Sequence, residues 1–181
     1  MFLRKNAALF IAITITILVI TGIIYGYKNP INISNYIASL EDNNNLILQH
    51  ILVILFFFIS TLSIIGIILQ TIYIGIESIS IGYIISNFII KYNIKGLIYS
   101  LITISINKGI YIIILSYLFT TSIVYIKRII NNLSGINKDS INDLLIPLLK
   151  KYLIIIIFLL LYDVLIYLFG NKFLNYLTFM L

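Results

Sequence analysis

Long apolar runs alternate with short polar connections along the whole chain. Apolar runs of about 18 to 25 residues are long enough, as helices, to cross a hydrocarbon core of about 30 Å. The pattern therefore predicts an all-α fold, a polytopic transmembrane helix bundle with about five crossings, as a single domain over residues 1–181. The predicted crossings lie near 7–27, 46–69, 71–90, 108–126 and 152–169.

The polar residues gather in the connections between these runs. A polar stretch extends over Lys28–Asn45, and a basic one over Lys127–Lys151. Only Gln70 and Thr71 separate the second run from the third, which predicts a tight hairpin turn at these residues. The far end of that hairpin is expected at Lys91–Lys95.

The run 96–126 is too long for one crossing. As a straight helix it would extend for about 46 Å, which would require extreme tilt. The polar triplet Asn107-Lys108-Gly109 offers a place to interrupt it. We therefore predict a broken or re-entrant segment near Asn107, with a short interfacial helix that ends at Ile106 and a true crossing after the break.

Composition strengthens the membrane interpretation and removes several kinds of site. Apolar residues make up 61% of the chain and charged residues only 10%, whereas a soluble domain carries about a quarter charged residues. Cysteine is absent and there is one histidine, so disulfides, iron–sulfur clusters, bis-histidine haem and histidine-based zinc sites are excluded. We expect no metal, no cofactor and, without a catalytic or phosphate-binding motif, no enzymatic activity.

The net charge of +6 is best explained by topology, because the basic residues lie at the ends of the apolar runs. Cytoplasmic connections carry an excess of Lys and Arg. Five crossings place both the pair Arg4 and Lys5 and the basic stretch Lys127–Lys151 inside. We therefore expect a multi-pass membrane protein with a cytoplasmic N-terminus and an extracytoplasmic C-terminus, in contact with lipid and not with nucleic acid.

Glu77 lies a turn or two inside the predicted crossing 71–90. An unpaired carboxylate there costs several kcal/mol, so it protonates, pairs or faces a polar cavity. Two interpretations stay open. Glu77 is either a functional group or a structural one that hydrogen-bonds inside the bundle or reaches the nearby cytoplasmic interface.

Other polar residues occur at or near predicted crossings. Lys108, at the expected break beside Asn107, could approach Asp163 in the outer half of the last crossing, and such a pair would fix the packing of the two helices. Lys108 could equally extend to the outer headgroups. His50, near the outer mouth of the second crossing, is expected to be an interfacial imidazole and not a proton relay.

Small residues recur at every fourth position of the third crossing, at Ser78, Gly82 and Ser86. This spacing places them on one helix face, where they let another helix approach closely. The face is expected to pack inside the bundle, and a homo-oligomer contact is the less favoured use.

The segment from Ser63 to Arg128 resembles the stage II sporulation protein M family. The similarity rests on Ser63-Ile-Ile-Gly66, Gly82, Lys95-Gly96, the polar break Asn107-Lys108 and the pair Lys127-Arg128, in that order. The resemblance implies a non-catalytic scaffold in the cell membrane of a sporulating bacterium. Such a scaffold recruits or anchors peptidoglycan-degrading proteins at the septum during forespore engulfment.

The polar residues also support a hypothesis from another class. A small transporter or permease subunit would use Glu77, Lys108 and Asp163 along a polar path through the membrane. These residues alone do not decide between the two functions.

Overall fold

The computed structural model describes residues 2–31, 46–134 and 140–170, and all regular structure in these segments is helical. The predicted all-α class is therefore confirmed. The elements in chain order are α1 (Phe2–Lys28), α3 (Leu46–Thr61), α4 (Ile64–Ile104), the π-helix η2 (Ser105–Gly109), α5 (Ile110–Leu133), α6 (Ile141–Leu165) and the π-helix η3 (Ile166–Gly170).

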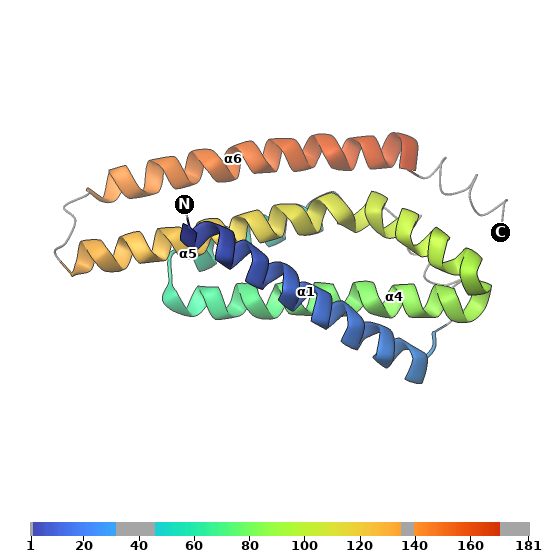
Figure 1. Ribbon diagram of the computed structural model, residues 1–181. Helices are drawn as coiled ribbons and strands as arrows, with labels where there is room; N and C mark the ends of the chain where they lie inside the picture. Colours follow the sequence, from blue (N-terminus) through green and yellow to red (C-terminus); the bar gives the residue numbers. More distant parts are fainter. Residues whose placement is uncertain (1, 32–45, 135–139, 171–181) are drawn as a thin grey trace.

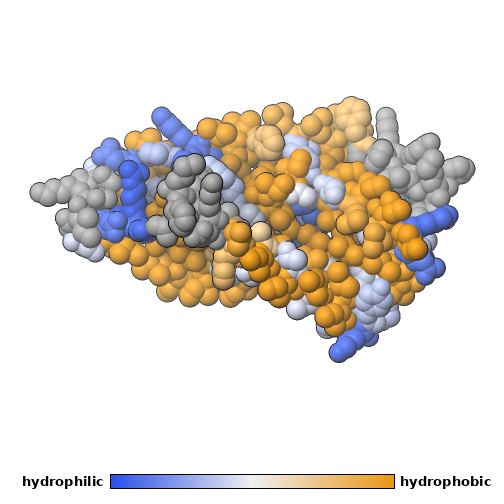
Figure 2. Space-filling view, in the orientation of Figure 1, coloured by the Kyte–Doolittle hydropathy of each residue, from blue (hydrophilic) through white to orange (hydrophobic). Residues whose placement is uncertain are grey.

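The helices form an elongated bundle in which α1 crosses α4 diagonally and α6 lies along α5 (Figure 1). Among the described residues, three apolar helical stretches have the length and composition to cross a membrane, namely Leu9–Lys28, Ile64–Leu133 and Asn142–Phe169, and α3 is a shorter apolar helix. Hydrophilic side chains gather toward the two ends of the bundle, and its middle is hydrophobic (Figure 2). This distribution fits a bundle whose middle lies in lipid.

The turn between α3 and α4 lies at Leu62 and Ser63, so the predicted turn at Gln70 and Thr71 is wrong. Gln70 is fully buried, and its amide nitrogen donates to the carbonyl of Phe57 (3.0 Å) at the end of α3. Its polarity therefore serves to stabilise a helix end and not a solvated turn. As a result, α3 ends at Thr61, before the predicted limit of residue 69.

Gly66 makes this tight turn possible. A Cβ atom at Gly66 would lie 1.8 Å from the carbonyl oxygen of Ser60, so α4 begins in direct backbone contact with α3. Only glycine leaves room for such an approach.

The long apolar stretch turns back on itself at Asn93, inside the predicted segment Lys91–Lys95. Asn93 has φ 52° and ψ −135°, and helical backbone resumes after it. Asn tolerates positive φ better than most residues do. Beyond the turn, Gly96 lies against the carbonyl of Phe88, and the rings of Phe88 and Tyr99 lie 5.1 Å apart.

No break occurs at Asn107 in this described segment, because the helix passes through it as the π-turn η2. The predicted re-entrant interruption is therefore wrong in kind, although the irregularity lies where the sequence indicates. A π-turn accommodates an extra residue per turn and keeps the backbone hydrogen-bonded, which suits a helix surrounded by lipid.

The connection between α5 and α6 is shorter than predicted. α5 continues to Leu133, and α6 begins at Ile141, eleven residues before the predicted crossing near 152–169. Ser140 and Asp143 form a capping box at this helix start, which satisfies backbone N–H groups that would otherwise be unpaired. The basic residues Lys127 and Arg128 therefore lie in the last third of α5, and Lys150 and Lys151 lie near the middle of α6.

The main apolar core lies where α3, α4, α5 and α6 meet. Its most deeply buried members are Ile54, Phe57, Leu115, Leu118, Leu148 and Leu159. By contrast, α1 packs on the outside of this group, chiefly against α4.

Candidate functional site

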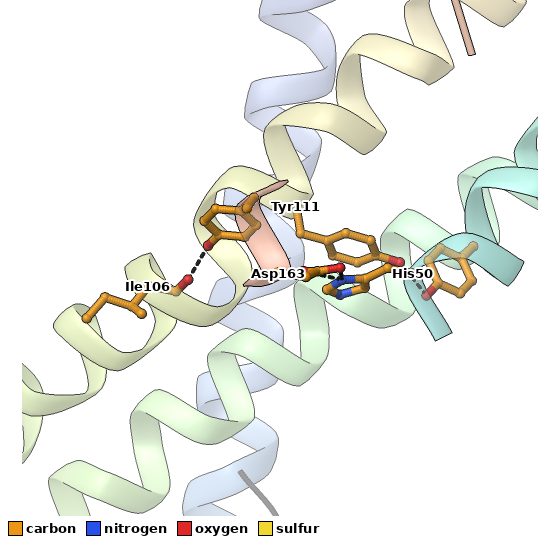
Figure 3. A network of polar contacts seen from close by, with 6 residues as sticks. His50, Ile106, Tyr111 and Asp163 are labelled. Atoms are coloured by element: carbon orange, nitrogen blue, oxygen red, sulfur yellow. Dashed lines mark hydrogen bonds and ion pairs between the residues drawn. The ribbon is translucent and has the colours of Figure 1, made fainter. Parts of the chain in front are cut away.

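A buried histidine–carboxylate pair joins α3 to α6. Asp163 is 2% exposed and His50 8% exposed, and Nδ1 of His50 lies 2.9 and 3.0 Å from the two carboxylate oxygens (Figure 3). A buried carboxylate needs a polar partner, because leaving it without one is strongly destabilising. His50 is therefore a buried partner of Asp163, and the expectation of an interfacial imidazole is wrong.

Tyr111 of α5 connects this pair to α4. Its ring stacks on the imidazole of His50, with centroids 4.2 Å apart and an interplanar angle of 23° (Figure 3). Its hydroxyl lies 2.9 Å from the hydroxyl of Tyr73, which α4 contributes. A line of contacts thus extends from α6 through α3 and α5 to α4, in which the step from His50 to Tyr111 is a ring stack and the others are hydrogen bonds.

Glu77 and Lys108 complete this line. Lys108 Nζ, in η2, lies 2.8 Å from Oε2 of Glu77, and the Tyr73 hydroxyl donates to Oε1 over 3.4 Å. Both charged side chains are partly buried, at 19% exposure for Glu77 and 27% for Lys108. We call this set the polar core: His50, Tyr73, Glu77, Lys108, Tyr111 and Asp163.

The structure selects among the alternatives that the sequence leaves open. Lys108 pairs with Glu77 and not with Asp163, and Glu77 is bonded inside the bundle. The sequence signal that could have identified the second pair is the single histidine near the same outer level as Asp163, because a buried acid requires a base.

The π-turn contributes a further contact next to the polar core. Tyr162, which precedes Asp163 on α6, donates its hydroxyl to the carbonyl of Ile106 in η2 (Figure 3). Asn107, in the same turn, has a buried side-chain nitrogen without a partner among the described residues. The predicted polar break is therefore where α6 binds to the irregular helix.

A second buried polar cluster was not predicted from the sequence. Thr61 Oγ1 lies 2.6 Å from Ser122 Oγ and 2.7 Å from the hydroxyl of Tyr152, and Gln70 donates to the same atom over 3.3 Å. In the sequence these polar residues are isolated within apolar runs, so nothing indicates that their side chains lie together. The cluster joins α3, α4, α5 and α6.

The small residues of α4 lie against α1. A Cβ atom at Gly82 would lie 1.9 Å from the carbonyl oxygen of Val19, and one at Gly22 would lie 2.2 Å from that of Ile79. Gly26 is equally close to Ser86. We call this contact the α1–α4 seam: Val19, Gly22, Gly26, Ile79, Gly82 and Ser86.

The seam contains few side-chain hydrogen bonds between its helices. The hydroxyls of Ser78 and Ser86 donate to carbonyls of their own helix, at Ile74 and Tyr83. At the end of α1, the Tyr83 hydroxyl donates to the carbonyl of Asn29 over 2.9 Å. We conclude that the small candidate residues let the backbones of α1 and α4 approach closely; these residues are Ser78, Gly82 and Ser86.

The polar core has the chemistry of a structural network or of a proton path. In the described part of the chain, no three His, Cys, Asp or Glu side chains gather as they would to hold a metal ion. Each of its carboxylates has a basic side chain within hydrogen-bond distance.

In comparison with known proteins, no protein-family model matches the chain, and no curated protein or solved structure is found to be similar.

Proposed function

We propose that the chain is a non-catalytic membrane scaffold of the stage II sporulation protein M type, which recruits or anchors peptidoglycan-degrading engulfment proteins at the septum. The observation that carries the proposal is the pairing inside the polar core. Glu77 with Lys108 and Asp163 with His50 join separate helices. Groups matched in this way hold a bundle in one arrangement and leave its lateral faces for partners.

The proposal includes five crossings with the N-terminus inside. In its support, α1 and the part of α4 before Asn93 run in the same direction in Figure 1, and α1 begins toward the end of the bundle where α5 ends and α6 begins. Reporter fusions after Asn137 should read cytoplasmic, and fusions at the C-terminus should read extracytoplasmic. Matching signals at the two positions would contradict this layout.

A pull-down from sporulating cells in mild detergent tests the scaffold role. The tagged full chain should retain cell-wall hydrolases of the engulfment machinery, and a variant with a disrupted α1–α4 seam should retain fewer at equal protein level. A chain that is abundant in the septal membrane yet retains no hydrolase would refute the scaffold.

A transporter or permease subunit remains the second candidate, because hydrogen bonds and one ring stack, between His50 and Tyr111, link Asp163 to Lys108. In proteoliposomes that contain a pH-sensitive dye, a proton path would give a flux that Glu77→Gln and Asp163→Asn abolish. The scaffold proposal instead expects no flux above that of empty liposomes.

A further inference from the structure

A cavity of about 210 Å³ lies between α5 and α6, away from the polar core. Two cationic side chains line it from opposite helices, Arg128 on α5 and Lys151 on α6. Cations that converge on one cavity from two helices make a site for an anion, since each donates charge-assisted hydrogen bonds.

A buried hydroxyl belongs to the same wall. Tyr125 is 6% exposed and lines the cavity, and its hydroxyl has no hydrogen-bond partner within the described residues. A buried polar atom left without a partner costs free energy, and it is commonly explained by a water, an ion or a ligand that the protein binds. Tyr125 thus adds a donor to the two cations.

Thr120 and Thr121 also line the cavity, and their hydroxyls donate to the carbonyl of Tyr117. The remaining lining is apolar and indicates the source of the anion. Val124, Pro147 and Leu148 form this part of the wall. A cavity of this size is below the roughly 300–1,000 Å³ of sites that enclose a drug-sized ligand, so it fits a charged group and not a whole lipid. An apolar wall beside a cationic one suits a headgroup whose acyl chains stay in the bilayer.

The height of the cavity agrees with such a ligand. In the sequence, Arg128 and Lys151 lie next to Lys127 and Lys150, just beyond the apolar runs 110–126 and 152–169, where basic residues commonly meet a bilayer's headgroups. Asp143, the acid nearest in sequence on α6, does not line the cavity. Its carboxylate accepts bonds from the backbone N–H and hydroxyl of Ser140, and it also interacts electrostatically with Arg128.

We propose that the α5–α6 cavity binds the phosphate group of an anionic membrane lipid through Arg128, Lys151 and the hydroxyl of Tyr125. The site goes beyond the scaffold role and does not depend on it. A failed hydrolase pull-down would leave the lipid site intact, and a failed lipid measurement would leave the scaffold proposal intact.

The test is native mass spectrometry of the detergent-solubilised full chain with phosphatidylglycerol, phosphatidylcholine or inorganic phosphate. Arg128→Gln with Lys151→Gln should weaken phosphatidylglycerol binding at least tenfold. The matched control is Lys127→Gln with Lys150→Gln, which removes the same charge at the same level from residues outside the cavity lining. The control should bind phosphatidylglycerol as the wild type does.

Tyr125→Phe removes one oxygen and keeps the ring, so it tests the site without disturbing the packing. It should weaken phosphatidylglycerol binding about fivefold, the effect of one hydrogen bond. It also keeps the proposal testable if the double variant at Arg128 and Lys151 fails to fold.

Three results would overturn the lipid site. Equal losses in the two double variants would mean that interfacial charge alone attracts lipid. Equal binding of phosphatidylcholine and phosphatidylglycerol would mean that the cavity does not select anionic lipid through its two cations. Binding of inorganic phosphate that displaces phosphatidylglycerol at equal concentration would assign the cavity to a soluble phosphate.

Discussion

The α1–α4 seam and the polar core join helices by opposite means. At the seam, glycines bring backbones into direct contact, as Gly82 does against Val19. In the polar core, long side chains reach across the space between helices, as Lys108 does toward Glu77. The seam depends on the absence of side chains, whereas the polar core depends on the presence of matched ones.

The difference predicts how each region responds to change. Dispersion between close backbones falls steeply with distance, so the seam is sensitive to added volume. A buried charge is costly without its partner, so the polar core is sensitive to the loss of one group and less so to the loss of both. Variants that add volume therefore test the seam, and variants that remove one member of a pair test the polar core.

The largest effect is expected for Gly82→Ala. The new methyl group would lie 1.9 Å from the carbonyl oxygen of Val19, and backbone atoms can relieve this overlap only if α1 moves away. Overpacking of this kind costs about 3 kcal/mol or more. Thermal unfolding in detergent should show a much lower midpoint than the wild type, and an unchanged midpoint would mean that α1 does not pack on this face.

Asp163→Leu should have the next largest effect, about 2–3 kcal/mol, because it leaves the buried Nδ1 of His50 without its partner. Asp163→Asn is the matched control, since it keeps an acceptor for the imidazole and removes only the charge. Thermal unfolding should separate the two variants clearly. Equal losses would show that charge, and not the hydrogen bond, is what His50 requires.

Lys108→Met should cost about 2 kcal/mol, less than a fully buried site would, since Glu77 is 19% exposed and can be partly solvated. Adding Glu77→Gln to this variant should recover part of the loss, because no unpaired charge then remains. Unfolding midpoints of both single variants and the double variant form a double-mutant cycle. Additive losses would contradict a direct interaction between the two side chains.

Much of the fold follows from the length and polarity of the runs. The turn at Asn93 and the irregularity at η2 lie where short polar groups interrupt long apolar runs. The α3–α4 turn was misplaced because polarity alone does not tell a solvated Gln70 from one that bonds to a neighbouring helix end. At the turn itself, Ser63 is flanked by the apolar residues Leu62 and Ile64, so the sequence does not indicate a turn there.

The site was less predictable than the fold. Spacing along one helix shows that Ser78, Gly82 and Ser86 share a face, but it does not show that α1 covers that face with Gly22 and Gly26. The partners of Lys108 and Asp163 likewise depend on helix rotation. Because η2 changes that rotation in the middle of a long helix, helical periodicity could not identify the partner of Lys108. The partner of Asp163 depends on how α6 is rotated against α3.

Gly75→Ala should have the smallest effect, and its sign should be opposite to that of Gly82→Ala. Gly75 is on the same helix and beside the same neighbour, α1, but a Cβ atom there would meet only a side-chain atom of Leu18 at an ordinary 3.6 Å. Gly75 also lines a cavity of about 140 Å³ between the two helices, which the methyl group would partly fill. Alanine is favoured over glycine in a helix interior by up to about 1 kcal/mol.

The unfolding midpoint of Gly75→Ala should therefore rise slightly above that of the wild type. Because both variants add the same methyl group to α4, the pair separates backbone contact from helix propensity. If Gly75→Ala lowered the midpoint as much as Gly82→Ala does, the close approach at Gly82 would no longer explain the loss, and the seam would have to depend on glycine in some other way.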